Sequence, residues 1–445
     1  MASIRKKVLI ISYLWPPMEG VGLIRASKFA KYLPEYGWEP IVLTVKTAAE
    51  TDPAGRILAD GVKVFRSDYA DVVDNLKKAA GGIRPGKKNG ISGGLGQGGD
   101  ERKMRGSSLI REMVTIPDEK IGWYRFALEE GKAIIEKENV DAILSTSPPE
   151  TTHLIARALK SKYGIPWIAD LRDLWAEDHF RQRPFIKTAL LRIMERRVLA
   201  AADAVITVSE PWANVLAKSL GTRGGRVHVI ENGFDEEDFE GLMHGGNKKL
   251  TITYMGKLHK DHQPVESFFW SLAHLVETRA IDPQKLDVRF YVLGYDKPDI
   301  TALARHYGLD GTVKEFPKVP YHEALKILRS SDILLFIQWR GRGEEGWYSA
   351  KLYDYIGARR PILAFSSKDG IIDRLIKRCS CGIVVDGMEE AEGALRTTYN
   401  EYISAGHVNY YGDDRQIGRL SRSMRTKDLA AILDQLTENV SICSR

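Results

Sequence analysis

The sequence has 445 residues, 43% of them apolar, and a formal net charge of +6. This length exceeds what one hydrophobic core usually covers, which argues against a single globule and predicts two domains. The three cysteines fit neither a disulfide framework nor a zinc pattern, and no apolar run is long enough for a signal peptide or a membrane span, so we expect a cytoplasmic protein, soluble or peripheral to a membrane.

The first half of the sequence alternates short apolar runs with amphipathic helical stretches, the pattern of βαβ units around a parallel sheet. A glycine-rich, basic stretch from about residue 79 to residue 107 interrupts the alternation. We expect a mobile loop there, because it holds almost no large apolar residues. The expected strands are 8–12, 40–45, 141–145, 166–170, 204–208 and 227–231, and the expected helices are 23–33, 151–162 and 211–220.

The alternation restarts after a polar, glycine-containing connection that begins near Asn232. We therefore predict an α/β fold with two doubly wound domains, residues 1–235 and 236–420, and a helical segment, 421–445, that packs back toward the first domain. Such domains bind ligands at the carboxyl ends of their strands. In the second domain the expected strands are 250–255, 287–293, 332–337, 361–365 and 382–385, and the expected helices are 264–278 and 350–356.

A candidate phosphate site follows the first expected strand. Gly20, Val21 and Gly22 open a helix that carries Arg25. Small residues in such a turn let backbone amides approach a phosphate, and the helix dipole favours its negative charge. The alternative interpretation is that the glycines only make a tight turn between strand and helix.

The first strand of the second domain leads to Gly256, Lys257 and Lys260. Two ammonium groups just beyond the carboxyl end of a strand are suited to compensate the charge of a diphosphate. Surface lysines are also common, so the alternative is that these side chains are only solvated.

An acidic loop, residues 344–346, enters the expected helix 350–356. Ser349 is placed to cap this helix, and the free amides of its first turn are suited to take phosphate oxygens. Asp354 lies about one turn inside the helix, where a carboxylate accepts ribose hydroxyls. The alternative is an ordinary amphipathic helix with exposed acidic residues.

In their order and spacing, these segments resemble the retaining GT-B glycosyltransferases of family four, the superfamily of glycogen synthase and phosphatidylinositol mannosyltransferase. The resemblance covers the whole chain and implies two Rossmann-like domains facing a central cleft. Each motif is weak alone, whereas the combination is specific. The motifs are Trp15-Pro16-Pro17 with Gly20 and Gly22, Ser145 to Pro149, Asp170 to Trp175, Ala202 to Ser209, Glu231 to Asp235, Gly256 to Leu258 and Lys351 to Pro361.

The resemblance implies roles for individual residues. The basic residues that hold the donor diphosphate fall on Lys257 and, loosely, Lys260, and the carboxylate that binds the ribose falls on Asp354. The glutamate that binds the sugar would stand eight positions earlier, at Gly346, so Glu344 or Glu345 is the displaced candidate. The further donor-binding candidates are Gly20, Val21, Gly22, Gly256, Tyr348, Ser349, Ala350 and Lys351.

The mechanism that the resemblance implies needs no metal and no cofactor besides the donor, a UDP- or GDP-sugar, because the departing phosphate takes the acceptor proton. The activity expected is that of a hexosyl- or N-acetylhexosaminyltransferase. Asp170 and Asp173 are separated by two residues and do not form an Asp-x-Asp metal site. The catalytic candidates are Asp170, Arg172, Asp173 and Glu345, and for the first three the alternative is structural salt bridging.

Charge is distributed unevenly along the chain. Residues 1–230 hold 36 Lys and Arg and 27 Asp and Glu, a charge of +9, which leaves −3 for the rest. Segment 181–197 mixes large apolar groups with basic ones, as interfacial helices do, although such a stripe also suits a core. We expect a lipid-linked or glycan acceptor, a role in cell-surface polysaccharide synthesis, and attachment to the inner face of the cytoplasmic membrane through Arg25, Arg192, Arg196 and Arg197.

Two other functions stay open. A sugar-nucleotide epimerase shares the two-lobed fold but needs acid and base groups in its cleft. A non-catalytic nucleotide-sugar-binding protein on a degenerate transferase scaffold is compatible with the displaced glutamate. Nucleic-acid binding has no support, because the basic half contains no recognition motif with interleaved aromatic residues.

Overall fold

The computed structural model describes residues 5–18, 20–47, 61–72, 115–177, 183–243, 245–294, 296–341 and 344–443. The loop expected at 79–107 lies outside these residues. The described residues form two compact units. Unit 1 comprises those of Met1–Val208, Trp212–Ile230 and Thr426–Arg445, and unit 2 comprises those of Ser209–Pro211 and Glu231–Arg425.

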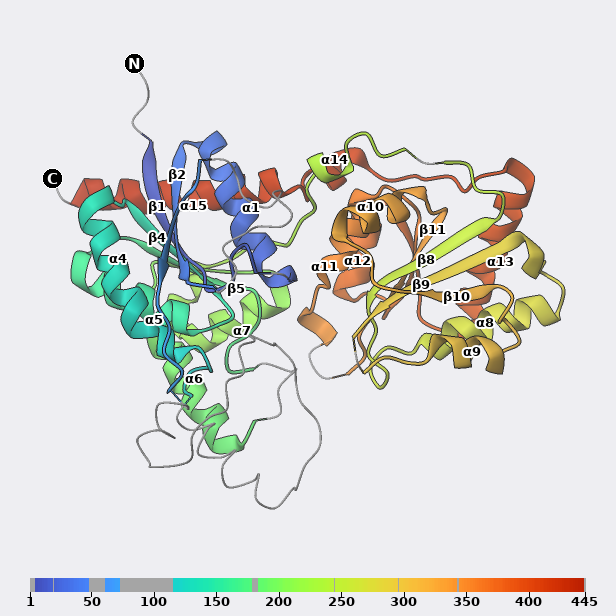
Figure 1. The fold of residues 1–445 in the computed structure, drawn as a ribbon, viewed down its shortest axis with the longest axis horizontal. Helices are drawn as coiled ribbons and strands as arrows, with labels where there is room; N and C mark the ends of the chain where they lie inside the picture. The colour runs from blue at the N-terminus through green and yellow to red at the C-terminus, as the bar shows by residue number, and fades with distance from the viewer. Residues whose placement is uncertain are drawn as a thin grey trace. The chain divides into compact units, whose positions relative to one another are not determined.

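Unit 1 is built on a seven-stranded sheet in which every pair of neighbouring strands is parallel, in the order β3-β2-β1-β4-β5-β6-β7. Figure 1 shows this sheet in blue and green. Its strands are β1 (Lys6–Ile11), β2 (Trp38–Val45), β3 (Lys63–Ser67), β4 (Ala142–Ser147), β5 (Trp167–Leu171), β6 (Ala204–Thr207) and β7 (Val227–Val229).

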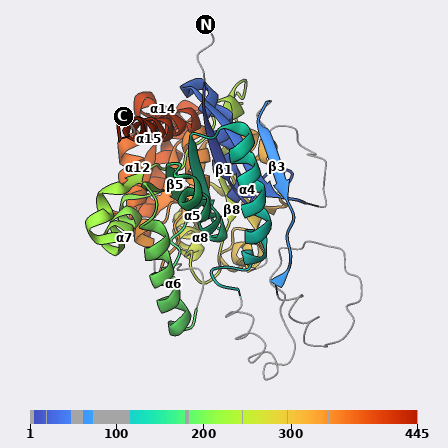
Figure 2. The ribbon, with the colours of Figure 1, turned by 90° about the vertical axis from the view of Figure 1, so that its left-hand side faces the viewer.

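Helices cover both faces of this sheet. One face packs against α1 and α15, because Phe29 of α1 and Leu429 and Leu433 of α15 join Val8 and Ile10 of β1 in one buried cluster. In Figure 2, α4 and α5 lie side by side over the other face. The helices are α1 (Ile24–Tyr32), α4 (Tyr124–Glu138), α5 (Thr151–Tyr163), α6 (Phe185–Leu199), α7 (Glu210–Leu220) and α15 (Arg422–Cys443), and the short 3₁₀ turns are η1 (Val21–Leu23), η2 (Leu33–Tyr36), η3 (Ile121–Trp123) and η4 (Gly221–Arg226).

Unit 2 repeats the plan with six parallel strands in the order β10-β9-β8-β11-β12-β13. The strands are β8 (Leu250–Lys257), β9 (Leu286–Leu293), β10 (Val313–Phe316), β11 (Ile333–Ile337), β12 (Ile362–Phe365) and β13 (Gly382–Val385). The helices are α8 (Val265–Glu277), α9 (Ile300–His306), α10 (Tyr321–Ser330), α11 (Ala350–Gly357), α12 (Ile371–Cys379), α13 (Met388–Ala405) and α14 (Asp414–Gly418), and the 3₁₀ turns are η5 (Glu237–Phe239), η6 (Pro283–Lys285) and η7 (Glu344–Gly346).

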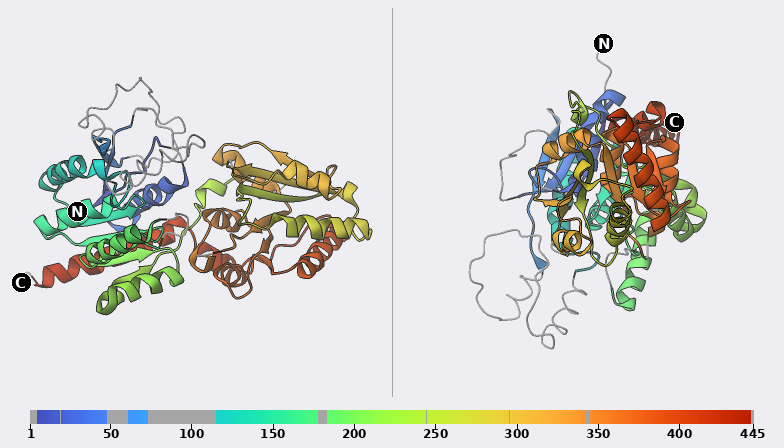
Figure 3. Two further views of the ribbon diagram at one scale, coloured as in Figure 1. Left: turned by 90° about the horizontal axis from the view of Figure 1, so that it is seen from below. Right: turned by 90° about the vertical axis from the view of Figure 1, so that its right-hand side faces the viewer.

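Two separate cores lie on the two faces of the second sheet. Residues of α8, α9 and α13 pack on one face and residues of α10, α11, α12 and α14 on the other, so helices flank the sheet on both sides (Figure 3). In α8, Val265, Phe268, Leu272 and Leu275 recur at intervals of three and four residues, and all four are buried. This spacing gives the helix one apolar stripe toward the sheet.

The fold class predicted from the sequence is confirmed, and each expected strand is present at nearly the expected residues. The alternation of apolar runs missed β3 and β10, each of which is one of the two edge strands of its sheet. An edge strand faces solvent on more sides, so β3 and β10 carry charged residues such as Lys63 and Lys314 in place of a continuous apolar run.

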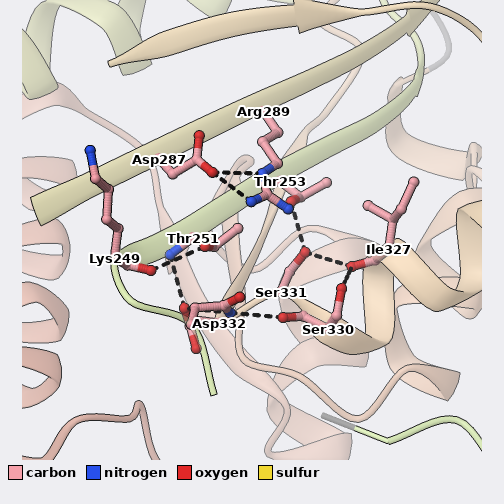
Figure 4. Close-up of polar contacts among 10 residues, drawn as sticks. Lys249, Thr251, Thr253, Asp287, Arg289, Ile327, Ser330, Ser331 and Asp332 are labelled. Carbon is pink, nitrogen blue, oxygen red and sulfur yellow. Dashed lines mark hydrogen bonds and ion pairs between the residues drawn. The ribbon is translucent and has the colours of Figure 1, made fainter. Parts of the chain in front are cut away.

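Polar contacts tie β8 to β11 at their amino ends (Figure 4). The Asp332 carboxylate is buried and accepts hydrogen bonds from the Thr251 amide at 2.9 Å and from Asn247 Nδ2 at 3.0 Å. Ser331 Oγ donates to Thr253 Oγ1 at 2.7 Å. Because the strands are parallel, their carboxyl ends all lie at the opposite edge of the sheet. The predicted site residues follow the strands at that edge.

Apart from the short excursion at Ser209–Pro211, the chain passes between the units at Ile230–Glu231 and again at Arg425–Thr426. Within unit 2, Glu231 joins these two crossing points. Its carboxylate accepts two hydrogen bonds from Arg378 Nη2, at 3.1 and 3.0 Å, and lies 3.6 Å from Arg425 Nη1. Backbone hydrogen bonds from Arg422 to Phe234 and from Phe234 to Leu420 hold the same two segments side by side.

Candidate functional site

The carboxyl end of β8 is shaped by a glycine. Gly256 has a φ of +127°, a backbone conformation that side chains disfavour, and a Cβ there would lie 3.2 Å from Lys351 Cδ. The next residue, Lys257, exposes its side chain while its carbonyl oxygen accepts a hydrogen bond from the Tyr254 hydroxyl at 2.7 Å. The glycine therefore allows Lys351 of α11 to lie across the strand end.

Lys351 brings its amine to the same strand end. Its Nζ donates to the Tyr254 hydroxyl at 2.6 Å, lies 3.4 Å from the Lys257 carbonyl oxygen, and sits 4.3 Å from the centre of the Tyr254 ring and 5.3 Å from that of Phe336. Burial lowers the pKa of this amine to about 7. The structure thus brings together three predicted donor-site residues, Gly256, Lys257 and Lys351.

The amino terminus of α11 lies beside this strand end, since Ala350 is its first residue and Lys351, which contacts Tyr254 and Lys257, is its second. Ser349 occupies the N-cap position, but its side chain makes no capping hydrogen bond, so the predicted hydroxyl cap is wrong. The backbone at Ser349 is extended. Its carbonyl oxygen, rather than its hydroxyl, accepts a hydrogen bond from the Leu352 amide at 3.1 Å. The field of the helix therefore favours an anion here.

Asp354 lies one turn further along α11 and is half-buried. Its Oδ1 accepts a hydrogen bond from the Tyr321 hydroxyl at 3.0 Å. Tyr321 is the first residue of α10, so a carboxylate and a phenol from two neighbouring helices meet at the carboxyl-end side of the sheet. The sequence motif identified Asp354 and missed Tyr321, because no local pattern marks that tyrosine.

Aromatic rings line the loops after β8 and β11. The His262 ring stacks on Trp339 with centroids 3.9 Å apart, and His259 and Trp347 meet Trp339 edge-on at 5.2 and 6.2 Å. Burial, and then the neighbouring Lys257 cation, lower the pKa of His259. Lys260 lies in the same loop with its side chain exposed.

The displaced acidic loop is arranged differently from the family pattern. Gly346 is buried, and its carbonyl oxygen accepts a hydrogen bond from Ser209 Oγ at 2.7 Å. Glu345 is exposed, and the Glu344 backbone belongs to η7. Tyr348 packs against the core around α12 and its hydroxyl lies 3.4 Å from the Ile371 carbonyl oxygen, away from the Lys351 amine.

In unit 1 the predicted residues Arg25 and Asp170 form a buried ion pair. Arg25 Nε donates to both carboxylate oxygens of Asp170 at 3.1 Å, and Thr146 Oγ1 donates to Oδ2 at 2.7 Å. The two side chains are 3% and 0% exposed. Such enclosure supports the alternative interpretation of Asp170, a structural salt bridge, and leaves Arg25 no surface to offer a membrane.

Arg172 holds backbone carbonyls together. Its guanidinium donates to Ser147 O at 2.8 Å, to Pro148 O at 2.9 Å and to Gly22 O. A Cβ at Gly22 would lie 2.6 Å from Leu14 Cδ1 and 3.3 Å from Arg172 Nη1, so the glycine makes room for both side chains. Burial lowers the pKa of Arg172, and the nearby Asp173 carboxylate partly offsets this effect.

The turn that Arg172 holds is the predicted phosphate loop. Gly20 has a φ of +128°, which favours glycine, and Val21 and Gly22 belong to η1. Arg172 therefore positions this loop relative to the end of β4. The structure brings Gly22, Arg25, Asp170 and Arg172 into one region of unit 1.

His153 is a buried group that the sequence analysis missed. Its Nδ1 lies 2.7 Å from Ser145 Oγ, which also accepts a hydrogen bond from Trp167 Nε1 at 2.7 Å. Burial lowers the pKa of His153 to about 3, so the ring is neutral near pH 7. The signal available in the sequence was its place in the first turn of α5, directly after the motif Ser145 to Pro149.

Helix α6 divides its residues between core and solvent. Leu191, Val198 and Leu199 are buried, whereas four large apolar side chains are exposed: Phe185 at 80%, Ile186 at 70%, Leu190 at 44% and Ile193 at 52%. Arg192, Arg196 and Arg197 are exposed on the same helix, and Arg192 pairs with Glu177. Over the described part of segment 181–197, the apolar stripe is thus not wholly core.

Within the part of the chain that the structure describes, no helix has both the length and the apolar character needed to cross a membrane. Among the same residues, no three His, Cys, Asp or Glu side chains cluster as they would around a metal ion.

The sequence was compared with models of known protein families. Residues 95–238 match the model of the family described as Glycosyltransferase Family 4. The matched segment, 144 of the 445 residues, is similar to glycosyltransferase family 4. No curated protein matches the sequence.

Solved structures of the same two-sheet fold align over nearly the whole chain. A glycosyltransferase from Rickettsia africae aligns with a TM-score of 0.60 at 13% identity, covering 98% of this chain and 99% of its own. Sucrose-phosphate synthase from Thermosynechococcus elongatus gives 0.56 at 14% identity, covering 99% and 98%. HepE from Anabaena, solved with UDP and glucose, gives 0.54 at 12% identity, covering 99% of each chain. The GT-B fold predicted from the sequence is confirmed.

Proposed function

We propose that this protein is a retaining, metal-independent glycosyltransferase of family 4 that moves a hexosyl or N-acetylhexosaminyl group from a UDP- or GDP-sugar to a lipid-linked acceptor in cell-surface polysaccharide or glycan synthesis. The observation that carries the donor part is the cationic strand end of unit 2. Lys351 and Lys257 flank Gly256, next to the amino terminus of α11. HepE, whose fold is similar, was solved with UDP and glucose.

The chemistry that these residues supply is positioning and charge compensation. Two ammonium groups and a helix terminus stabilise the negative charge that grows on the diphosphate as the bond to the sugar breaks. In a retaining transfer of this kind, the departing phosphate oxygen takes the proton of the acceptor hydroxyl on the same face of the sugar. Asp354, with Tyr321 beside it, is the ribose-binding carboxylate of this proposal.

Replacing Lys257 with alanine should weaken the binding of UDP or GDP by roughly 1.5–3 kcal/mol, or about 10- to 150-fold in Kd, because one charge-assisted contact is lost. The side chain is exposed, so the fold should be unaffected. Isothermal titration calorimetry measures the change. Lys326→Ala, which removes an exposed lysine of α10, is the matched control, and equal affinities of all three proteins would contradict the donor-site assignment.

Transfer activity should persist in EDTA. The described residues offer no metal-binding cluster, and the cations of Lys257 and Lys351 with the α11 amides are placed to compensate the phosphate charge that a metal compensates in other transferases. The measurement is sugar transfer in EDTA with and without added magnesium or manganese. Activity that stops with the chelator and returns with the ion would show that the mechanism is metal-dependent.

A second candidate is donor binding without turnover. Gly346 stands where the resemblance to family 4 implies a sugar-binding glutamate, its carbonyl accepts a hydrogen bond from Ser209, and the adjacent Glu345 faces solvent. A screen of nucleotide sugars by thermal shift identifies the donor, and the hydrolysis of that donor then separates the two functions. Tight binding with neither hydrolysis nor transfer would favour the binding protein.

The acceptor part of the proposal is supported by α6. Exposed phenylalanine, isoleucine and leucine side chains beside exposed arginines match an interfacial helix that lies on an anionic membrane. The excess of positive charge in residues 1–230 points the same way. A lipid-linked acceptor is therefore the substrate class that this surface suits, and the attachment proposed is peripheral, at the inner face of the cytoplasmic membrane.

A further inference from the structure

The half-buried Lys351 amine lies among groups that do not neutralise its charge. It contacts the Tyr254 hydroxyl, the Lys257 carbonyl oxygen and the faces of the Tyr254 and Phe336 rings. In the described part of the chain, no Asp or Glu forms an ion pair with it, and burial lowers its pKa to about 7. This half-buried amine thus lacks the counter-charge that lysines removed from water usually have.

The groups that contact the Lys351 amine are neutral or positive. From β8 and the loop after it come Tyr254, Lys257 and His259. Burial and then the positive charges of Lys257 and Lys351 lower the pKa of His259, while Asp296 raises it. From β11 comes Phe336, which carries no charge. On α11 itself, the helix terminus adds a positive field, and Asp354 turns its carboxylate to Tyr321 of α10.

We propose that binding of the donor diphosphate is coupled to the uptake of one proton by Lys351, so that the full ammonium charge forms when the phosphates arrive. This inference rests on the proposed function of the site. The diphosphate supplies the negative counter-charge that the protein does not provide. This pairing raises the pKa of the Lys351 amine, so the ammonium keeps its proton to a higher pH than in the empty site. Without the donor, the neutral amine keeps its hydrogen bonds to Tyr254 and Lys257, so the empty site stays folded around it.

The sign of the pH dependence follows from linkage. Below about pH 7 the amine of the empty site already carries its proton, so binding takes up none there. Above about pH 7 the empty site has lost the proton and the occupied site retains it. The dissociation constant should therefore rise about tenfold per pH unit in this range and level off below it.

Calorimetric titration with UDP near pH 8, in buffers that differ in ionisation enthalpy, measures the proton number directly. The native protein should take up roughly one proton. Lys351→Arg keeps a permanent cation, so it should bind UDP with no proton uptake. Lys351→Met, which is similar in size and uncharged, should bind more weakly and also without uptake. Lys326→Met is the matched surface control and should behave as the native protein.

His259→Asn should leave the uptake near pH 8 intact, because the pKa of His259 is lowered and the ring is already neutral there. UDP binding without proton uptake, or uptake that persists in Lys351→Arg, would overturn the inference while leaving the donor site in place. Failure of both UDP and GDP to bind at any pH from about 6 to 9 would contradict the proposed function, and the inference with it.

Discussion

Replacing Asp170 with alanine should lower the free energy of unfolding by about 3–5 kcal/mol, because it leaves the Arg25 guanidinium buried without its partner. Asp170 is fully buried, Arg25 is almost so, and two hydrogen bonds and an ion pair join them. The Thr146 hydroxyl would lose its acceptor as well. Chemical denaturation of the native and variant proteins measures the difference.

The matched control is the double variant Arg25→Met with Asp170→Leu, which removes both charges and keeps most of the volume. It should be much more stable than the single variant, since replacing a whole buried pair with apolar groups is often neutral. A single variant as stable as the native protein would show that the pair is not enclosed. A double variant that folds normally and loses transfer activity would restore Asp170 as a catalytic candidate.

Replacing both Phe185 and Ile186 with serine should abolish most binding to vesicles of phosphatidylcholine and phosphatidylglycerol. These side chains are 80% and 70% exposed at the start of α6, and burying a large apolar side chain is worth about 1.5–3 kcal/mol. Neutralising Arg192, Arg196 and Arg197 together should weaken binding by about 1 kcal/mol per residue. Vesicle co-sedimentation measures both effects.

Salt separates the two contributions to membrane binding. Raising the ionic strength should weaken the vesicle binding of the native protein and the residual binding of the Phe185/Ile186 variant, because exposed charges are screened over about 10 Å at 0.1 M. Met243→Ser, at an equally exposed apolar residue of unit 2, is the control and should bind as the native protein does. Absence of binding at low salt, or binding indifferent to every one of these changes, would favour a soluble acceptor.

Much of the candidate donor site was predictable from the sequence because its residues follow one another. Gly256 and Lys257 end one strand, and Ser349 to Asp354 begin one helix, so a motif preserves their spacing. The chemistry of each residue was less predictable. Lys351 contacts Tyr254 of β8 and Phe336 of β11, and Asp354 accepts a hydrogen bond from Tyr321 of α10. These partners belong to other elements of the chain, so the motif around Lys351 and Asp354 does not contain them.

Local pattern in this sequence was enough for the doubly wound fold, since burial recurs with the period of a strand or helix in consecutive residues. It missed β3 and β10, whose edge positions remove the apolar run. Tertiary structure alone decided that Arg25 meets Asp170, 145 residues away, and that α6 turns Phe185 and Ile186 to solvent. Pairing and exposure depend on what lies across the sheet or beyond the helix, and a residue's neighbours in sequence do not carry that information.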